Sequence, residues 1–145
     1  MDKQDFHNEL ALLYLLYISD GIHSRVRLQK LVCLIQFTQK KLSPFSFQYK
    51  SHYYGPYSEL LRKKLDDLFI RNLIDEKTIT KDEGEGWSSV YSYFYCITEK
   101  GKEVLKSNLK EIERGVGAID AVLDKYGQSS TELIIRAALE FLHDK

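Results

Sequence analysis

Apolar positions in the first half of the chain recur every three or four residues, which predicts three helices. These helices are expected at about residues 5–18, 25–40 and 58–74. The first is apolar on nearly all sides, which is typical of a helix at the centre of a core. Gly21 follows it at a position suited to a left-handed C-cap, and Ser24 and Ser58 are expected to cap the next two helices.

The second predicted helix has one apolar stripe and one polar side. Leu28, Leu31 and Ile35 belong to the stripe that faces the core. The polar positions are expected to face water. They are Arg27, Lys30, Gln36, Gln39 and Lys40.

After the third helix the apolar period changes to two, and this predicts a β-hairpin of residues 74–80 and 90–97. The connector, residues 81–86, supplies the glycines of a turn. Trp87 lies near the tip of this hairpin. It either anchors a partner or covers the hairpin's own face.

Residues 99–126 are expected to form one long helix, because apolar residues alternate spacings of four and three over about three heptads. The seam consists of Leu105, Leu109, Ile112, Val116, Ile119, Leu123 and Tyr126. Gly115 and Gly117 interrupt the seam and allow a bend. The seam favours a homodimer, and the alternative is packing against a last helix that begins at a capping box of Ser129 and Glu132.

The order of three helices, a hairpin and a further helix is that of a winged helix-turn-helix. The predicted fold is therefore α+β and mostly helical, with a winged-helix domain at residues 1–98 and a C-terminal helical extension at 99–145. Residues 41–57 form an aromatic insertion in that domain, punctuated by Pro44 and Gly55-Pro56. A connection of this length without a helix is often functional.

Composition places the chain among ordinary globular proteins, with 145 residues, 43% of them hydrophobic, and 21 basic against 21 acidic residues. The apolar run at residues 11–18 is too short to span a bilayer, and the N-terminus lacks the basic start of a secretory signal. A cytoplasmic location is expected. Cys33 and Cys96 lie in apolar segments and are expected to be buried, reduced thiols, with a disulfide or redox role as the alternative.

Positive charge is concentrated before the hairpin. Residues 1–73 contain eleven basic and seven acidic residues, whereas residues 74–97 contain two basic and five acidic ones. Since DNA binding requires cations on the presented helix, we expect duplex DNA to meet the third helix and not the acidic hairpin tip. The candidate nucleic-acid-binding residues are Lys40, Lys41, Lys50, Arg62, Lys63 and Lys64. The alternative for this cluster is a solvated helix face.

Residue patterns typical of catalysis or cofactor binding are absent from the sequence. The four histidines are scattered singly, so no zinc site is expected. They are His7, His23, His52 and His143. Glycine-rich phosphate loops and nucleophile motifs are also missing. We therefore expect no enzymatic activity, no cofactor and no metal.

Two blocks of sequence resemble a known family. Residues 27–32 read Arg-Leu-Gln-Lys-Leu-Val, and residues 53–58 read Tyr-Tyr-Gly-Pro-Tyr-Ser before the apolar run 61–74. Together they resemble the YwgA-like and SocA-like (Panacea) group over residues 6–75. That resemblance implies a winged-helix-like domain found in antitoxins, phage-associated proteins and proteolytic adaptors. The second block is either a recognition surface or a structural turn.

A looser resemblance, to MarR and PadR regulators, covers residues 68–126. It depends on Asn72-Leu73-Ile74, the hairpin, and the Tyr-Cys-Ile-Thr-Glu-Lys-Gly run at 95–101, and Asn72 replaces the usual glycine. PadR-type relatives follow the hairpin with a long dimerising helix. The resulting hypothesis is a dimeric DNA-binding regulator. The alternative is an antitoxin- or adaptor-type module whose aromatic insertion and acidic hairpin contact a protein partner such as a toxin.

Overall fold

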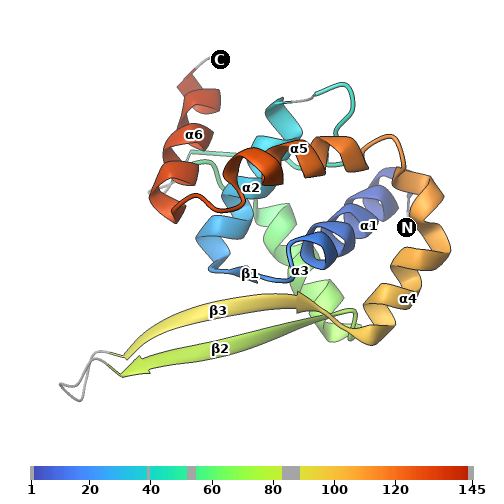
Figure 1. The fold of residues 1–145 in the computed structure, drawn as a ribbon, viewed down its shortest axis with the longest axis horizontal. Helices are drawn as coiled ribbons and strands as arrows, with labels where there is room; N and C mark the ends of the chain where they lie inside the picture. The colour runs from blue at the N-terminus through green and yellow to red at the C-terminus, as the bar shows by residue number, and fades with distance from the viewer. Residues whose placement is uncertain (1, 39, 52–54, 83–88, 144–145) are drawn as a thin grey trace.

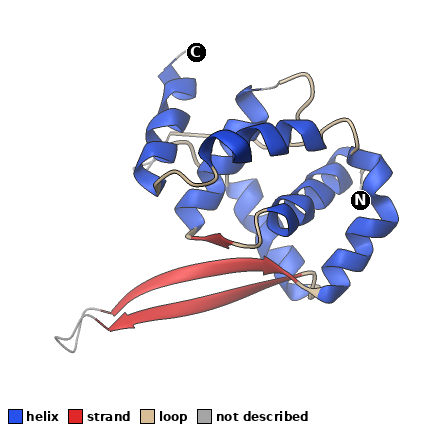
Figure 2. Ribbon diagram, viewed as in Figure 1, coloured by secondary structure: helices blue, strands red, loops and turns tan. Residues whose placement is uncertain are grey.

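The computed structural model describes residues 2–38, 40–51, 55–82 and 89–143. Its fold is α+β and mostly helical, with the helices gathered on one side of a small sheet (Figures 1 and 2). The elements in chain order are α1 (Lys3–Ile18), β1 (Ile22–His23), α2 (Arg25–Thr38), α3 (Glu59–Ile70), β2 (Ile74–Asp82), β3 (Ser89–Ile97), α4 (Glu99–Asn108), η1 (Leu109–Ile112), α5 (Val116–Tyr126) and α6 (Thr131–His143).

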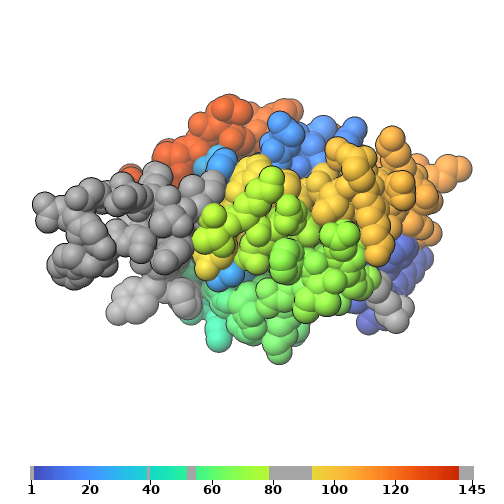
Figure 3. Space-filling model, turned by 90° about the horizontal axis from the view of Figure 1, so that it is seen from below, coloured from blue at the N-terminus to red at the C-terminus, as the bar shows by residue number. Residues whose placement is uncertain are grey.

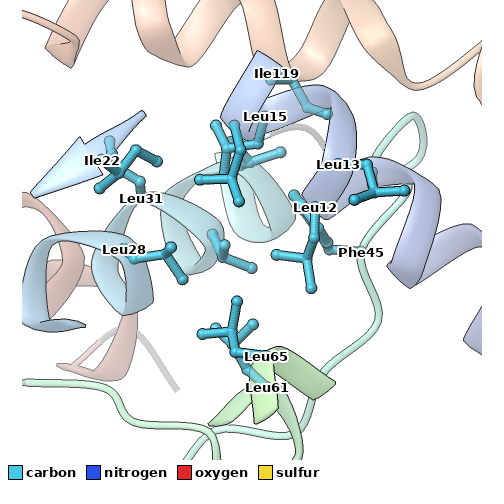
Figure 4. Close-up of a cluster of buried hydrophobic side chains, with 14 of the residues drawn as sticks. Leu12, Leu13, Leu15, Ile22, Leu28, Leu31, Phe45, Leu61, Leu65 and Ile119 are labelled. Carbon is cyan, nitrogen blue, oxygen red and sulfur yellow. The ribbon is translucent and has the colours of Figure 1, made fainter. Parts of the chain in front are cut away.

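Helix α1 lies at the centre of the core, as its apolar surface predicts. It begins after Asp2, whose carboxylate accepts the Asp5 N–H at 2.7 Å. Leu12 and Leu15 are fully buried and lie among residues from α2, α3 and α5 (Figure 4). Each such leucine contributes about 1.5–3 kcal/mol by leaving water. The packing of α1 against α2, α3 and α5 therefore forms a large part of the core.

Two turns depend on left-handed backbone conformations. The left-handed residue of the α1 C-cap is Asp20, at φ +59°, one residue before the predicted position; Gly21 follows at φ +99° and donates its N–H to the Leu16 carbonyl at 3.1 Å. A Cβ at Gly21 would lie 2.2 Å from the Phe94 ring, so the turn also needs glycine for space. Asn72 has φ +63°, and it completes the turn after α3 without glycine.

The sheet contains three antiparallel strands in the order β1-β3-β2. The register of β2 and β3 runs from Ile74 opposite Ile97 to Asp82 opposite Ser89, which confirms the predicted hairpin. Strand β1, which sequence reasoning missed, pairs with the other edge of β3. Trp87 and the rest of residues 83–88 lie outside the described residues.

The prediction of one continuous helix over residues 99–126 is wrong. The chain forms α4, the 3-10 turn η1 and α5, with a break at residues 109–115. Gly115 packs on Pro44 of the aromatic insertion, and a Cβ there would lie 2.8 Å from the proline ring. The close contact with Pro44 holds the break in place.

Breaking the helix redirects the predicted dimer seam into the chain's own core. Leu105, Ile112 and Ile119 are buried, whereas Leu109 is exposed. Val116, Leu123 and Tyr126 are half-buried against the same core. The seam is therefore not a continuous stripe that a second copy can reach in this conformation.

The last helix, α6, begins one residue later than its predicted cap implies. Ser130, and not Ser129, accepts the Leu133 N–H at 3.2 Å. Helix α6 then packs on α2 through buried Ile134 and Ala138. Among the described residues, no helix is both long and apolar enough to cross a membrane.

Candidate functional site

The N-terminal half of α2 ties four other segments together through polar side chains. Arg25 reaches β2 and β3, and Arg27 reaches the turn between α5 and α6. The Arg27 guanidinium donates to the carbonyls of Gly127 at 2.9 Å and Ser129 at 2.7 Å, and burial lowers its pKa. The prediction that Arg27 faces water is therefore wrong, because carbonyl oxygens replace its hydration.

Gln29 holds the start of α3. Its side-chain amide accepts the Ser58 N–H at 2.9 Å and donates to the Ser58 carbonyl at 2.8 Å, and both bonds are buried. The Ser58 hydroxyl in turn accepts the Leu61 N–H at 3.2 Å, which caps α3. The two sequence blocks of the family resemblance are thus two halves of one contact. This confirms a structural role for Gly55 and Ser58, whereas residues 52–54 lie outside the described residues.

The aromatic insertion is held to the helices by two further amides. Gln36 bonds both backbone groups of Phe47, at 2.8 and 2.9 Å, and Asn8 accepts the Ser46 N–H at 2.9 Å. Phe45 and Phe47 are buried in the core. The described part of the insertion therefore serves packing more than recognition.

Lys30 is buried, which contradicts its predicted place on the wet side of α2. Only 1% of its surface is exposed, and its ammonium donates to the Pro56 carbonyl at 2.8 Å. Burial lowers its pKa to about 8, and the nearby Cys33 thiol opposes this shift. Within the described parts of the chain, no carboxylate forms an ion pair with Lys30.

A hollow of about 540 Å³ opens beside Lys30, between α2, α3, β3 and the segment that precedes α3. We call it the α2–α3 hollow. Its charged lining residues are Arg25, Lys30, Lys50, Arg62, Glu59 and Asp66. Arg25 stacks over the Tyr93 ring at 3.8 Å and donates to the Tyr95 hydroxyl and to Glu76, both at 2.9 Å. Its guanidinium is therefore held rigidly at one wall.

The structure distributes the six predicted nucleic-acid-binding residues over three places. Lys50 and Arg62 line the α2–α3 hollow. Lys63 and Lys64 line a second hollow of about 550 Å³ on another side of α3, which we call the α1–α3 hollow. Lys40 and Lys41 are exposed after the end of α2 and line neither hollow. The six residues therefore do not form one continuous surface on α3.

Lys64 is unavailable to a phosphate in this conformation. It is 8% exposed, and its ammonium lies 3.0 Å from Asp5 and 3.5 Å from Glu9. Asp67 lies 3.8 Å away, and Arg71 binds the same Glu9 carboxylate. Lys64 therefore joins α1 to α3 as a structural cation.

Arg62 is also engaged by its own helix. Its guanidinium lies 2.6 Å from Glu59 and 2.7 Å from Asp66, and the Glu59 carboxylate raises the pKa of Arg62. Lys63 is exposed and has no ion pair among the residues that the structure describes. Helix α3 consequently offers little free positive charge.

The exposed side of α3 is instead notably apolar. Leu60 is 51% exposed and Ile70 is 80% exposed. Leu60, Lys63, Asp67 and Ile70 follow one another at spacings of three and four and so share one face. We call these four residues the α3 outer face. Helix α3 lies on the side of the molecule seen from below, next to β2 (Figure 3).

Comparison with known proteins reveals a relative whose function is not described. The chain is similar to the uncharacterized protein YwgA of Bacillus subtilis (strain 168), with 32% identity over 104 residues. The matched region is 72% of this chain and 57% of that protein, so the chain spans little more than half of its relative's length. No family model matches the chain. The similarity supports the YwgA-like relationship that the two sequence blocks indicate.

Proposed function

We propose that this chain is an interaction module of the adaptor or antitoxin type, which binds a protein partner through the α3 outer face. The observation that supports this most is the exposure of Ile70 and Leu60 on a helix whose cations are mostly paired within the chain. Exposed apolar side chains that line up on one helix are typical of a docking surface.

The outer face also indicates the chemistry of its partner. Leu60 and Ile70 lie on either side of Lys63, whose ammonium has no carboxylate partner among the described residues. The α1–α3 hollow borders the same side of α3. An amphipathic helix with apolar residues one to three turns apart and an acidic residue between them fits this arrangement.

DNA binding is the second candidate, and a specific observation favours it. The order α1-β1-α2-α3-β2-β3, with β1 on the outer edge of β3, is typical of a winged helix, in which α3 enters the major groove. However, Arg62 and Lys64 would each have to leave carboxylate partners to reach a phosphate. The affinity of DNA-binding proteins depends mostly on phosphate neutralisation, so we rank this candidate second.

The test compares two single substitutions of equal chemistry. Ile70→Glu changes the outer face, whereas Leu133→Glu changes a 49% exposed leucine on α6. The wild-type chain and both variants are each used to capture proteins from the native host. The candidate partner is then purified, and its affinity for each of the three chains is measured by calorimetry. We expect Ile70→Glu to weaken binding by about tenfold or more and Leu133→Glu to leave it within about twofold.

A binding assay with random duplex DNA provides the opposing outcome. If the wild type binds duplexes with an affinity that falls steeply with salt, and Lys63→Glu abolishes this binding while Ile70→Glu does not, DNA binding replaces the proposed function.

A further inference from the structure

We propose that the α2–α3 hollow binds a small organic phosphate monoester, with Arg25 and Lys50 as the groups that hold the phosphate and Lys30 as the buried positive charge in its wall. This inference goes beyond the proposed partner surface, because it concerns a small ligand and another side of α3. Three independent features of the hollow support it.

The first feature is the uncompensated charge of Lys30. Its ammonium has three donors, of which one is bonded to the Pro56 carbonyl. Burying a cation without an opposite charge costs several kcal/mol, and buried lysines are usually paired. An anion in the adjoining hollow supplies the missing counter-charge. The pKa of about 8 keeps Lys30 mostly protonated at neutral pH.

The second feature is the charge balance of the lining. Four cationic residues line the hollow against two carboxylates, those of Glu59 and Asp66, and Glu76 pairs with Arg25 from outside the lining, which leaves an excess of one positive charge. A phosphate monoester carries about −1.5 to −2 charges at pH 7 and is opposite in sign to this excess. Glu76 lies outside the lining and binds Arg25 through Nη2. Among the described residues, the Nη1 group of Arg25 has no hydrogen-bond partner and is available to an oxyanion.

The third feature is the size and apolar content of the hollow. Its volume of about 540 Å³ lies within the range of small-molecule sites. Val26, Leu65 and the rings of Tyr57 and Tyr95 supply apolar and aromatic surface beside the cations. Such walls favour a ligand with an organic part over a free inorganic ion.

The experiment is a ¹⁵N NMR titration of the full chain with phenyl phosphate at constant ionic strength, with chloride as the replaced anion. We expect the chemical-shift changes to saturate and to centre on Arg25, Lys30 and Tyr57. Inorganic phosphate and benzoate should bind more weakly than phenyl phosphate. Lys30→Met, which retains the apolar stem, is expected to weaken phenyl phosphate binding by about tenfold or more. Lys63→Gln removes one charge from α3 outside the hollow and is the matched control, expected within about twofold.

Three outcomes would overturn the proposal. They are the absence of saturation at millimolar phenyl phosphate, shifts spread evenly over the surface, and tighter binding of benzoate than of phenyl phosphate. If Lys30→Met does not fold, Lys50→Gln, at an exposed position of the lining, is tested in its place. An unchanged affinity of Lys50→Gln for phenyl phosphate would also contradict the proposal. Because Ile70 does not line the hollow, failure here leaves the partner surface untouched, and Ile70→Glu tests that surface separately.

Discussion

Two buried lysines on different sides of α3 have opposite surroundings. Lys64 lies among three carboxylates from α1 and α3, so its charge is balanced inside the chain. Lys30 donates to a neutral carbonyl and has no carboxylate partner among the described residues, and the titratable group that acts on it is the Cys33 thiol. Lys64 therefore joins α1 to α3, whereas Lys30 leaves a positive charge beside the α2–α3 hollow. Burial alone does not identify a structural lysine; its partners do.

Replacing Lys64 by Met is expected to have the largest effect. The variant leaves Glu9 buried with Arg71 as its remaining cation partner, and removing one member of a buried ion pair costs about 3–5 kcal/mol. Since Arg71 persists, we expect a loss of about 2–4 kcal/mol in the free energy of unfolding, measured with urea. Lys63→Met, one residue earlier and exposed, should lie within about 0.5 kcal/mol of wild type. Equal losses in both variants would contradict the structural role of Lys64.

Replacing Gln29 by Leu tests the contact between the two sequence blocks. It leaves the buried N–H and C=O of Ser58 without partners, and each unsatisfied group costs about 1–3 kcal/mol. We expect a loss of about 2–3 kcal/mol in urea unfolding. Gln128→Leu, at an exposed position, should change stability by less than about 0.5 kcal/mol. A small loss for Gln29→Leu would show that water satisfies Ser58.

The lowered pKa of Lys30 predicts how stability depends on pH. Above a folded-state pKa of about 8 and below the unfolded value of about 10.5, the unfolded chain holds more protons, so raising the pH favours the folded state. From pH 7 to 9.5, the free energy of unfolding of wild type should rise by about 1–2 kcal/mol relative to that of Lys30→Met. Urea unfolding at both pH values measures this difference. If the free energy of unfolding of wild type rose as the pH is lowered over this range, the lowered pKa of Lys30 would be contradicted.

At pH 7 the Lys30→Met variant should change stability by less than about 1 kcal/mol. The buried Pro56 carbonyl loses its donor, but the cost of burying an unpaired cation disappears as well. Urea unfolding beside Lys64→Met checks the contrast between the two lysines. Losses of similar size in the two variants would mean that an anion from the chain itself already balances Lys30.

The Ile70→Glu variant should have the smallest effect on the isolated chain. Its side chain is 80% exposed, so we expect a change of at most about 0.5 kcal/mol in thermal or urea unfolding. A large loss would show that Ile70 packs in the folded chain, and the α3 outer face would then lose its main apolar residue.

The local features of the fold could be predicted because they depend on residues close in sequence. The apolar surface of α1, the alternation in the hairpin and the cap at Ser58 are all of this kind. The break after α4 was not predictable, since it depends on Gly115 meeting Pro44, which lies 71 residues earlier. Gly115 indicated where the helix could bend, but the sequence did not indicate the contact with Pro44 that holds the break.

The candidate sites were less predictable, because partners far apart in sequence determine the environment of each charge. Lys64 was assigned to an exposed face, yet Asp5 and Glu9 reach it from α1. Lys30 was assigned to the polar side of its helix, yet its ammonium is bonded to the carbonyl of Pro56 in the turn before α3. The co-occurrence of the two family blocks was the signal that α2 and this turn are in contact.

The tether of Arg27 to the turn between α5 and α6 also affects the order in which the protein matures. The guanidinium of Arg27 is separated by 102 residues from the carbonyl of Ser129 that it binds. At ribosomal speeds of about 5–20 residues per second, the newly made N-terminal half waits roughly 5–20 seconds for this partner. During that interval α2 lacks the cover that Ile134 and Ala138 of α6 provide, so the surface beneath them stays in contact with water until the last helix is made.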